Sequence, residues 1–325
     1  MALVDAHGRK INYLRLSVTD RCNLRCTYCM PAQGVAKVIC GDVLRYEELL
    51  QLAAAAVRIG IEKIRVTGGE PLVRKGLPAC LTQLAGLPGL RQLVLTTNGV
   101  LLAEQAAALK TAGVQRLNIS LDSLRPEIFA RITRGGDLAR VMAGIAAAEA
   151  EGFPIKINMV VMRGVNDDEV ADFAAMTLDK PITVRFIEYM PAARVEDFRA
   201  LLVPGSEILA ALAQRFSLHT VESSELCGPS RDFRIAGAAG SLGLITPLTG
   251  HFCGDCNRLR VTSTGMVRSC LFGNDVVDLK PLLADTDTAA LEQALRRLVE
   301  EKPAGHRLDE PTLTPVPFAM AAIGG

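Results

Sequence analysis

From Tyr13 to Tyr189, short runs of β-branched and aliphatic residues alternate with longer Ala- and Leu-rich stretches. The short runs are typical of buried strands, whereas the longer stretches have helical apolar spacing and several end at a glycine. The predicted strands are Tyr13–Val18, Lys63–Thr67, Gln92–Thr96, Arg116–Ser120, Ile155–Val161 and Thr183–Tyr189. The predicted helices are Arg45–Ile59, Leu102–Ala112, Leu138–Glu151 and Asp168–Leu178. This alternation indicates an α/β fold with a parallel sheet and right-handed crossovers.

Two arrangements accommodate six such strand–helix units: a doubly wound sheet and a partial barrel. The polar motifs follow the predicted strands, and barrel enzymes build their sites at the carboxyl ends of strands. We therefore predict a partial (βα)6 barrel of the TIM-like type.

The alternation fades after Met190-Pro191. Glu207–Arg215 and Asp287–Glu301 predict two more helices, and Ser223–Gly243, rich in Gly and Ser, predicts a loop. We therefore expect two domains: a barrel at residues 1–220 and a smaller C-terminal domain at residues 221–325.

Composition narrows the class of protein. A net charge of +1 argues against a surface that coats nucleic acid, and no uninterrupted apolar run is long enough to span a bilayer. The first ten residues lack the apolar region of a signal peptide. Nine cysteines without an export signal favour a reducing compartment, and thus a cytoplasmic protein with metal or thiol chemistry.

Three cysteines follow the first predicted strand at C-x3-C-x2-C spacing: Cys22, Cys26 and Cys29, here called the first triad. A compact loop brings three thiolates onto one soft metal centre, which suits an iron–sulfur cluster or zinc. Three protein ligands leave one position open or need a distant fourth residue. Spacing alone leaves a structural zinc knuckle as an alternative.

This motif resembles the cluster loop of the radical S-adenosylmethionine enzymes, and Tyr28 occupies their aromatic position beside the adenine. The resemblance implies a [4Fe-4S] cluster whose fourth iron binds the amino and carboxylate groups of S-adenosylmethionine. Reductive cleavage then gives a 5′-deoxyadenosyl radical. The cofactor supplies this chemistry, and the protein supplies binding and orientation.

Three further segments match this family. Thr67-Gly68-Gly69-Glu70-Pro71 resembles its GGEP loop, which implies a contact of Gly69 with the methionine amino group. Paired glycines let backbone approach a ligand with free N–H and C=O groups, although such a run is also typical of a tight turn. Ser120 and Met190 match residues that bind S-adenosylmethionine. Ser120 and Asp122 capping the helix at Pro126, and Met190 filling the core, are the alternatives.

Cations occur inside strands that we expect to be buried on both faces: Arg15, Arg65 and Lys156. A buried cation requires an anion. Carboxylates such as Glu70 are one source of that anion, and a polyphosphate bound in a barrel lumen is another.

A second set of cysteines, Cys253, Cys256 and Cys270, here called the second triad, again offers three thiolates. Zinc with His251 as fourth ligand is the alternative to a second cluster with an open iron. Arg258 and Arg260 alternate directly after Cys256, on one side of a predicted strand, where they suit phosphate binding.

Both triads, the run Cys-Gly-Asp-Cys-Asn-Arg-Leu-Arg and the terminal Gly324-Gly325 together resemble the GTP 3′,8-cyclase family over essentially the whole chain. Two segments, His7–Lys10 and Gly135–Gly136, are not explained by this resemblance. Three cysteines outside the triads are interpreted as ordinary buried or free thiols: Cys40, Cys80 and Cys227.

The resemblance implies conversion of GTP to (8S)-3′,8-cyclo-7,8-dihydroguanosine 5′-triphosphate, the first step of molybdenum cofactor biosynthesis. It implies two [4Fe-4S] clusters: the first binds S-adenosylmethionine, and the second, in the C-terminal domain, binds guanine. Its S-adenosylmethionine-binding residues are Tyr28, Gly69, Ser120 and Met190. Its GTP-binding residues are Arg15, Arg65, Thr96, Lys156, Arg258, Leu259 and Arg260. Gly324 and Gly325 are its catalytic residues.

The implied partners are a flavodoxin-like or ferredoxin-like electron donor and the downstream cyclic pyranopterin monophosphate synthase, and a homodimer fits the same pattern. We expect no partner among nucleic acids or membranes. Two other functions stay open. One is a radical S-adenosylmethionine enzyme that modifies a peptide and carries an auxiliary cluster, and the other is a non-catalytic, zinc-stabilised binding protein.

Overall fold

The computed structural model describes residues 2–35, 41–191, 198–222, 226, 228–273, 276–284, 288–306 and 320. Within them the strands form one sheet, in the order β12-β11-β10-β1-β2-β3-β4-β5-β6-β9-β8-β7. Its first six strands are β1 (Tyr13–Ser17), β2 (Lys63–Thr67), β3 (Gln92–Thr97), β4 (Arg116–Ser120), β5 (Ile155–Val161) and β6 (Thr183–Glu188). They pair in parallel and in chain order, as the sequence predicts.

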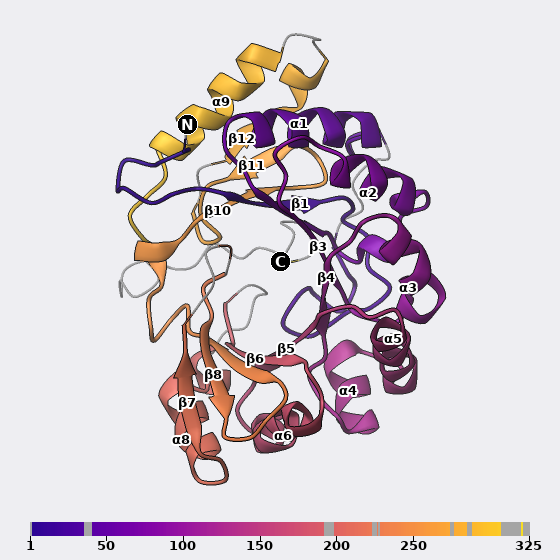
Figure 1. Cartoon of the computed structure of the whole chain (residues 1–325), viewed down its shortest axis with the longest axis vertical. Helices are drawn as coiled ribbons and strands as arrows, with labels where there is room; N and C mark the ends of the chain where they lie inside the picture. The colour runs from indigo at the N-terminus through magenta and orange to yellow at the C-terminus, as the bar shows by residue number, and fades with distance from the viewer. Residues whose placement is uncertain are drawn as a thin grey trace.

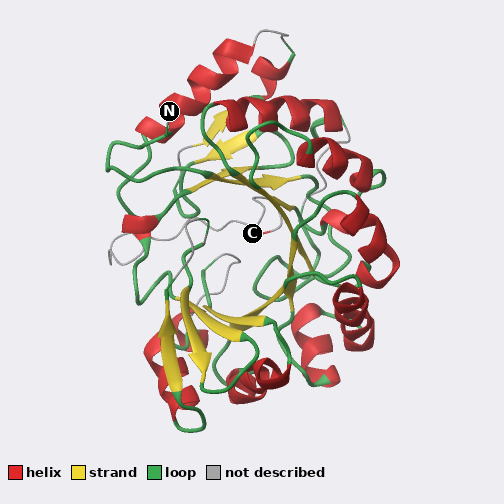
Figure 2. Ribbon diagram, in the orientation of Figure 1, coloured by secondary structure: helices red, strands yellow, loops and turns green. Residues whose placement is uncertain are grey.

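Helices cover the outer face of this curved sheet (Figures 1 and 2). They are α1 (Tyr46–Arg58), α2 (Leu77–Ala85), α3 (Leu102–Thr111), α4 (Pro126–Thr133), α5 (Leu138–Ala150) and α6 (Val170–Asp179). Short 3-10 turns are η1 (Pro71–Val73), η2 (Asp167–Glu169), η3 (Cys253–Asp255) and η4 (Lys280–Leu283). The α/β fold and its partial-barrel character are confirmed by this arrangement, in which the concave face of the sheet is open to the interior.

The C-terminal part of the chain extends the sheet on both sides. Its strands are β7 (Leu218–Val221), β8 (Arg231–Ile235), β9 (Ser241–Ile245), β10 (Arg258–Val261), β11 (Met266–Arg268) and β12 (Val276–Asp278). β10 pairs in parallel with β1, and β9 pairs in parallel with β6. Its helices are α7 (Phe198–Leu201), α8 (Gly205–Ala213) and α9 (Thr288–Glu300), which packs on α1.

The prediction of a loop over Ser223–Gly243 is wrong, because β8 and the start of β9 lie within it. Phe233 and Ile235 of β8 are buried, and the Gly- and Ala-rich residues between them and β9 form only the turn of a hairpin. Composition alone overstated the irregular length, since two strands of five residues need few apolar positions.

Alternation along the strands separates an apolar outer face from a polar inner one. In β5, Ile155, Ile157 and Met159 are buried, whereas Asn158 and Val160 point toward the interior cavity described below. We expected strands buried on both faces. Apolar side chains pack against the helices on one face, whereas the other face borders the cavity. The inner face is where polar groups are free to meet a ligand.

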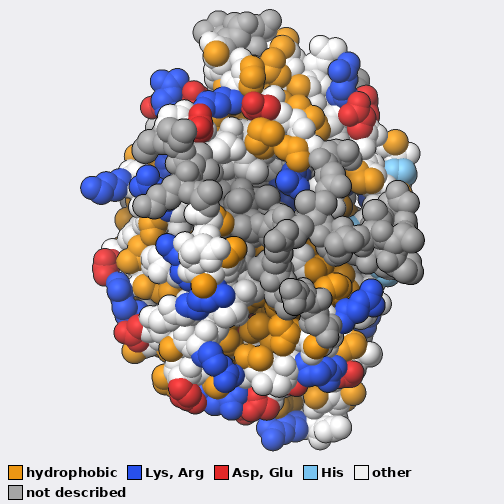
Figure 3. Space-filling model, turned by 180° about the vertical axis from the view of Figure 1, so that it is seen from behind, with side chains coloured by type: hydrophobic (Ala, Val, Ile, Leu, Met, Phe, Trp, Pro, Cys, Tyr) orange, Lys and Arg blue, Asp and Glu red, His pale blue; other side chains and the backbone are white. Residues whose placement is uncertain are grey.

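The outer surface carries mixed charge. On the face opposite to that of Figure 1, Lys and Arg side chains lie interspersed with Asp and Glu around the rim (Figure 3). This agrees with the net charge of +1. No helix in the described ranges is both long and apolar enough to cross a membrane.

Candidate active site

The inner face of the sheet surrounds a cavity with a volume of about 260 Å³. Most of the residues predicted to bind a cluster, S-adenosylmethionine or GTP contribute to its wall. They are Arg15, Cys22, Cys26, Tyr28, Cys29, Arg65, Gly69, Thr96, Ser120, Met190, Cys253, Cys256, Arg258, Arg260 and Cys270. The sequence motifs, spread over more than 250 positions, therefore converge on one space.

The two triads lie at opposite ends of the parallel strands. The first triad follows the carboxyl end of β1, whereas Cys253 and Cys256 precede the amino end of β10, which runs parallel to β1. β11 runs antiparallel to β10, so Cys270, just beyond β11, returns to the amino-end edge. A ligand that contacts both triads must therefore extend along the strands. The expectation that all chemistry lies at the carboxyl ends is wrong for the second triad.

Arginine side chains hold the loop of the first triad. Arg25 Nη1 donates to the Cys22 carbonyl at 2.8 Å, and Arg134 Nη1 donates to the carbonyls of Arg25 and Met30 at 2.8 and 2.9 Å. A Cβ at Gly136 would lie 3.0 Å from Leu24 Cδ2 in the same loop. Loop carbonyls need donors when regular secondary structure supplies none. The segment that contains Gly135–Gly136 thus supports the first triad.

Gly68 and Gly69 pack directly on the backbone of that loop. A Cβ at Gly69 would lie 2.3 Å from the Arg21 carbonyl oxygen, and one at Gly68 would lie 2.7 Å from that of Thr19. The Gly69 N–H donates to the Thr19 carbonyl at 2.7 Å. The prediction that this N–H stays free for a ligand is therefore wrong. The close backbone approach that requires glycine is made to the loop of the first triad.

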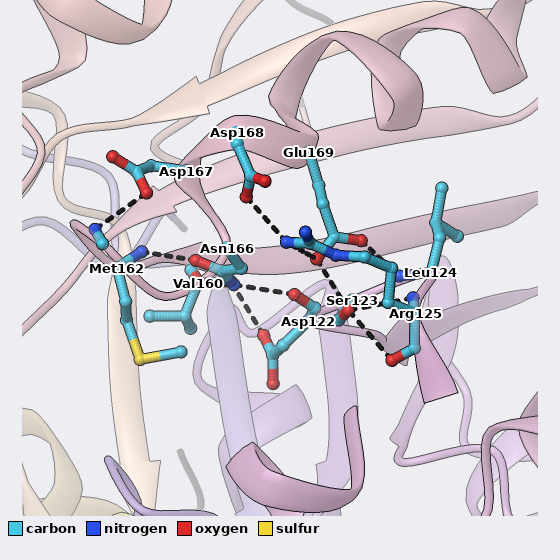
Figure 4. A network of polar contacts seen from close by, with 11 residues as sticks. Asp122, Ser123, Leu124, Arg125, Val160, Met162, Asn166, Asp167, Asp168 and Glu169 are labelled. Carbon is cyan, nitrogen blue, oxygen red and sulfur yellow. Dashed lines mark hydrogen bonds and ion pairs between the residues drawn. The ribbon is translucent and has the colours of Figure 1, made fainter. Parts of the chain in front are cut away.

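Tyr28 is fixed by Asp122, which lies just beyond β4. The Tyr28 hydroxyl donates to Asp122 Oδ2, and the Val160 N–H donates to Asp122 Oδ1, both at 2.9 Å. Asn166 Nδ2 donates to the carbonyls of Asp122 and Val160 at 2.7 and 2.9 Å (Figure 4). Burial raises the pKa of Asp122 to about 6, although its hydrogen bonds to Val160 and Tyr28 oppose the shift. Tyr28 is therefore held by a network that begins on β5.

The same network shows whether Asp122 caps the helix that begins at Pro126 or supports the site. The N-cap residue of α4 is Arg125, and no side chain caps that helix. Arg125 instead pairs with Asp168 at 2.7 Å and with Glu169 at 3.0 Å, and Glu169 accepts a hydrogen bond from Ser123 (Figure 4). The helix-capping alternative for Asp122 is therefore wrong, because its carboxylate holds Tyr28 and β5.

The donor chemistry of the first triad fits a metal centre. Burial raises the pKa of Cys22, and burial together with Asp122 and Cys29 raises that of Cys26 well above its usual range. A bound metal centre stabilises the thiolate and removes this penalty.

A zinc ion and a four-iron cluster make different demands on three cysteines. Over the described residues, no three His, Cys, Asp or Glu side chains come together closely enough to hold one ion. Sulfurs on one zinc each lie about 2.3 Å from the ion and so lie close together. The three cysteines of a four-iron cluster bind separate irons, which places them further apart. The separation of the three sulfurs is therefore the feature that distinguishes the two kinds of centre.

Positive charge surrounds the second triad. Burial alone raises the pKa of Cys256, but Arg258 and Lys302 outweigh it and lower that pKa to about 6. Arg258 Nη2 lies 3.5 Å from Cys256 Sγ. His251, the fourth ligand in the zinc alternative, does not contribute to the cavity wall, and its ring packs 5.2 Å from that of His306, which does.

Three arginines face one another across adjacent strands. Arg15 of β1 lies opposite Arg260 of β10 on one side and Arg65 of β2 on the other. Burial, together with Arg260 and Arg65, lowers the pKa of Arg15 well below its usual range. Like charges packed side by side in a buried site are costly without an anion. This row therefore favours an anionic ligand.

Glu70 does not have the role that the salt-bridge alternative gives it. Its carboxylate accepts hydrogen bonds from the Leu72 N–H at 3.0 Å, the Thr97 hydroxyl at 2.8 Å and the Asn98 N–H at 2.6 Å. Burial raises its pKa to about 7 against these bonds. Glu70 therefore supports the end of β3.

Several cavity residues escaped sequence reasoning. Arg185 of β6 is buried between apolar neighbours. The sequence signal that singled out Arg15, a cation between apolar residues of a strand, would also have found Arg185. Tyr13 and Asn158 also line the cavity. Six buried polar atoms there or nearby have no hydrogen-bond partner in the described chain: Tyr13 Oη, Arg65 Nε, Thr96 Oγ1, Asn118 Oδ1, Asn158 Oδ1 and Arg185 Nε. Orphaned groups of this kind indicate a polar ligand.

The remaining predicted residues lie elsewhere. Lys156 starts β5 beside the cavity, and burial with Arg185 and Arg116 lowers its pKa to about 7. Leu259 is fully buried on the helix side of β10. Cys80 is a buried free thiol in α2, as predicted. The predicted residues outside the described ranges are Cys40, Cys227, Gly324 and Gly325. Met320, nearest to that tail, lines the cavity and donates its N–H to the Cys29 carbonyl at 3.1 Å.

Comparison with known proteins gives the same picture. The radical SAM superfamily matches residues 16–177, and the family described as Molybdenum Cofactor Synthesis C matches residues 182–308. GTP 3′,8-cyclase from Geobacter sulfurreducens is 63% identical over 326 residues, covering 100% of both chains. The chain belongs to the GTP 3′,8-cyclase family. A second member, from Moorella thermoacetica, is 45% identical over 99% of each chain.

Solved structures support the fold of this GTP 3′,8-cyclase family member. Streptococcus suis SuiB superposes with a TM-score of 0.63 at 13% identity, over 92% of this chain and 68% of SuiB. The structure of SuiB bound to S-adenosylmethionine gives a TM-score of 0.61 at 12% identity. Membership confirms the predicted use of S-adenosylmethionine and iron–sulfur clusters, and it makes the non-catalytic zinc-protein alternative wrong.

Proposed function

We propose that this chain converts GTP to (8S)-3′,8-cyclo-7,8-dihydroguanosine 5′-triphosphate, the first step of molybdenum cofactor biosynthesis. The observation that carries this function is one cavity with a cysteine triad at each edge of the sheet and a row of arginines between them. A radical reaction needs two reactants held rigidly within contact distance. Two separate anchoring points along one set of strands meet that need.

The first triad would hold a [4Fe-4S] cluster, with S-adenosylmethionine contacted by Tyr28, Gly69, Ser120 and Met190. When bound, this pair supplies the radical chemistry that removes a hydrogen atom from the GTP ribose. The orientation of Tyr28 is fixed by the hydrogen bond that its hydroxyl donates to Asp122 Oδ2. The Gly69 N–H serves the loop, so its carbonyl is the group left for the methionine amino group.

The second triad would hold a cluster that binds guanine at its open iron. The triphosphate and ribose then extend along the strands toward the first triad. Charge-assisted hydrogen bonds favour arginine for such a ligand. The proposed contacts are Arg15, Arg65, Thr96, Lys156, Arg258, Leu259 and Arg260, and we add Arg185 from its place in the cavity. Leu259 has its side chain on the far face of β10, so its contact would come from backbone.

The C-terminal Gly324-Gly325 would act beside the reacting groups. Met320, five residues before the end, already reaches the first triad through its bond to the Cys29 carbonyl. Two residues without side chains fit where a Cβ would collide. Removal of both glycines should leave the clusters and S-adenosylmethionine binding intact and stop cyclisation. Full cyclisation by the shortened chain would remove the tail from the mechanism.

We also propose the cytoplasm as the compartment, a flavodoxin-like or ferredoxin-like electron donor, and a cyclic pyranopterin monophosphate synthase as the next enzyme. A homodimer is the proposed assembly. The division into residues 1–220 and 221–325 is retained as a proposal, with the second cluster and the tail in the second part.

The test is anaerobic incubation of the reconstituted protein with GTP, S-adenosylmethionine and a reductant. We expect 5′-deoxyadenosine and a cyclised nucleotide in equal amounts. Omission of GTP provides the control, because uncoupled cleavage gives 5′-deoxyadenosine alone. Formation of 5′-deoxyadenosine without any nucleotide product, over a range of GTP concentrations, would contradict the proposed function.

A further inference from the structure

Behind the second triad, the chain that leaves α9 presents a buried lysine. Lys302 is only 2% exposed. Its ammonium group donates to the Arg258 carbonyl at 3.2 Å and also to the Ser269 carbonyl. Arg258 lies two residues after Cys256, and Ser269 directly precedes Cys270. One side chain thus joins the segments that carry two cysteines of the triad.

A second buried cation reaches the third cysteine from the start of the chain. Arg9 Nη1 donates to the Cys253 carbonyl at 2.8 Å and to the Ala304 carbonyl at 2.9 Å, and Nη2 donates to the Pro303 carbonyl at 2.7 Å. Arg9 lies in the segment His7–Lys10, which the family resemblance did not explain. Its guanidinium fork fills the space between the second triad and the chain after α9.

Asp5 fixes the orientation of Arg9. Asp5 Oδ2 accepts from Arg9 Nε at 2.6 Å, while Oδ1 accepts the N–H groups of His7 and Arg9 at 2.9 Å. The arginine and its carboxylate are both buried. A buried pair that is fully hydrogen-bonded has one geometry, and here that geometry aims the remaining donors at the three carbonyls.

The chain that follows Lys302 runs along the second triad. A Cβ placed on Gly305 would lie 3.6 Å from Cys253 Sγ and 3.5 Å from Cys253 Cβ. His306, the next residue, lines the cavity and contacts the Pro247 carbonyl at 2.8 Å. Displacement of residues 302–306 would therefore move the wall of the second triad.

We propose that Arg9 and Lys302 are positioning residues that set the spacing of Cys253, Cys256 and Cys270 for their cluster. Cys253 and Cys256 share one segment before β10, whereas Cys270 lies in another after β11, so the backbone of either segment alone does not fix the position of Cys270 relative to the other two. Donors from Arg9 and Lys302 do so through carbonyls at or near each cysteine. This inference rests on the proposed function, since it takes the second triad to bind a cluster that meets GTP.

The experiment uses the full chain, reconstituted anaerobically, in the variants Arg9→Gln, Arg9→Lys and Lys302→Met. Lys280→Met is the matched control, because Lys280 also donates to a loop carbonyl, that of Gly41 at 2.9 Å, away from both triads. Iron and sulfide per chain are measured, with the electron paramagnetic resonance spectrum of the reduced protein with and without GTP. Cleavage of S-adenosylmethionine without GTP reports the first triad separately.

We expect Arg9→Gln and Lys302→Met to lose about half of the iron, that is about four of eight atoms. They should also lose the spectral response to GTP and keep S-adenosylmethionine cleavage within about twofold, as expected when only one of two sites is perturbed. Arg9→Lys keeps the charge without the fork, so it should fall between Arg9→Gln and the wild type. Lys280→Met should match the wild type.

Two results would overturn the inference: full iron with a normal GTP response in both variants, or equal loss from both sites with parallel loss of S-adenosylmethionine cleavage. The second result would mean that these cations stabilise the fold as a whole. A different result in the wild-type protein would overturn both the proposed function and this inference. That result is a second triad without iron, or an electron paramagnetic resonance spectrum that does not change when GTP is added.

Discussion

The first triad lies in one continuous loop, from Cys22 to Cys29, whereas the second is assembled from segments before β10 and after β11. The first loop is held locally and by neighbours at the carboxyl edge of the sheet: Arg25, Arg134 and the backbone at Gly68–Gly69. The second is held by Arg9 and Lys302, which come from the two ends of the described chain. A short motif therefore specifies the first site, and only the folded chain specifies the second.

The electrostatic settings differ as well. Burial raises the pKa of Cys22 and Cys26 in the first triad. In the second, Arg258 and Lys302 overcome burial and lower the pKa of Cys256 to about 6. In the first triad, the charge of Arg25 acts in the opposite direction on Cys22 but does not overcome burial, and Asp122 adds to the rise for Cys26. The second lies beside Arg258, which is also a proposed triphosphate contact, so under the proposed function one positive region would serve both the metal site and the substrate.

The largest expected effect comes from removing each triad in turn. Changing Cys22, Cys26 and Cys29 to Ala should abolish S-adenosylmethionine cleavage and leave the iron of the second site in place. Changing Cys253, Cys256 and Cys270 to Ala should retain uncoupled cleavage and impair GTP binding. Iron analysis, 5′-deoxyadenosine release and equilibrium GTP binding measure these outcomes. Normal GTP binding by the second variant would break the comparison.

A matched pair of glycine substitutions tests the comparison of the two triads more closely. Gly69→Ala places a Cβ 2.3 Å from a carbonyl oxygen of the first loop, which only backbone movement can relieve. We expect loss of iron from the first site and at least about a hundredfold slower S-adenosylmethionine cleavage, the cost of a misplacement of about 1 Å. Gly254→Ala, within the second triad, meets nothing within 4 Å and should keep full iron. Equal behaviour of the two variants would contradict this account.

A smaller effect is expected for Arg260, which is 6% exposed and lies opposite Arg15. A charge-assisted bond contributes about 1.5–3 kcal/mol, so Arg260→Ala should weaken GTP binding about ten- to a hundredfold. Guanosine, which lacks phosphates, should lose far less affinity. Arg234→Ala, an exposed strand arginine, is the control. Similar losses for both ligands would identify Arg260 as a structural residue.

The smallest effect is a pH dependence. Lys63 Nζ lies 4.7 Å from the ring centre of Tyr13, a cavity residue, and burial with Arg65 and Arg116 lowers the pKa of Lys63 to about 6. Burial with Arg185 and Arg116 lowers the pKa of Lys156 to about 7. A bound triphosphate favours the charged lysines and raises these pKa values, so binding takes up protons. Affinity for GTP should therefore increase as pH falls from about 9 to about 7, by less than about tenfold per pH unit. Titration calorimetry in two buffers should detect the proton uptake, and Lys156→Met should reduce it. A pH-independent affinity would count against both lysines.

Much of this architecture could be predicted from sequence. Lys63–Thr67, Arg116–Ser120 and Ile155–Val161 are strands with the predicted bounds, because β-branched runs flanked by turn residues have few alternatives. The first triad was predictable since its ligands lie within eight residues. Arg15 and Arg65 were predictable because a cation between buried apolar neighbours requires an anionic partner.

The remaining features depend on pairing between distant segments. Nothing near Arg9 in the sequence indicates that it reaches Cys253, and nothing near Lys302 indicates its bond to Arg258. The strand β8 was missed because its two buried side chains, Phe233 and Ile235, give a weak periodic signal in a Gly-rich region. The sequence led us to assign the Gly69 N–H to a ligand. Only the folded loop shows that this N–H already donates to the Thr19 carbonyl.

The placement of β9 and β10 has a consequence for how the chain is made. β1 and β6 flank the six-stranded core, and each finds its outer parallel partner only in residues synthesised later. Until β9 leaves the ribosome, both outer strands of the nascent sheet have unpaired N–H and C=O groups, and β1 keeps them until β10 follows. Such edges are templates for aggregation. A chain that stops at residue 220 would therefore expose two unpaired edge strands, β1 and β6. It should precipitate or require a chaperone, even though its first triad is complete.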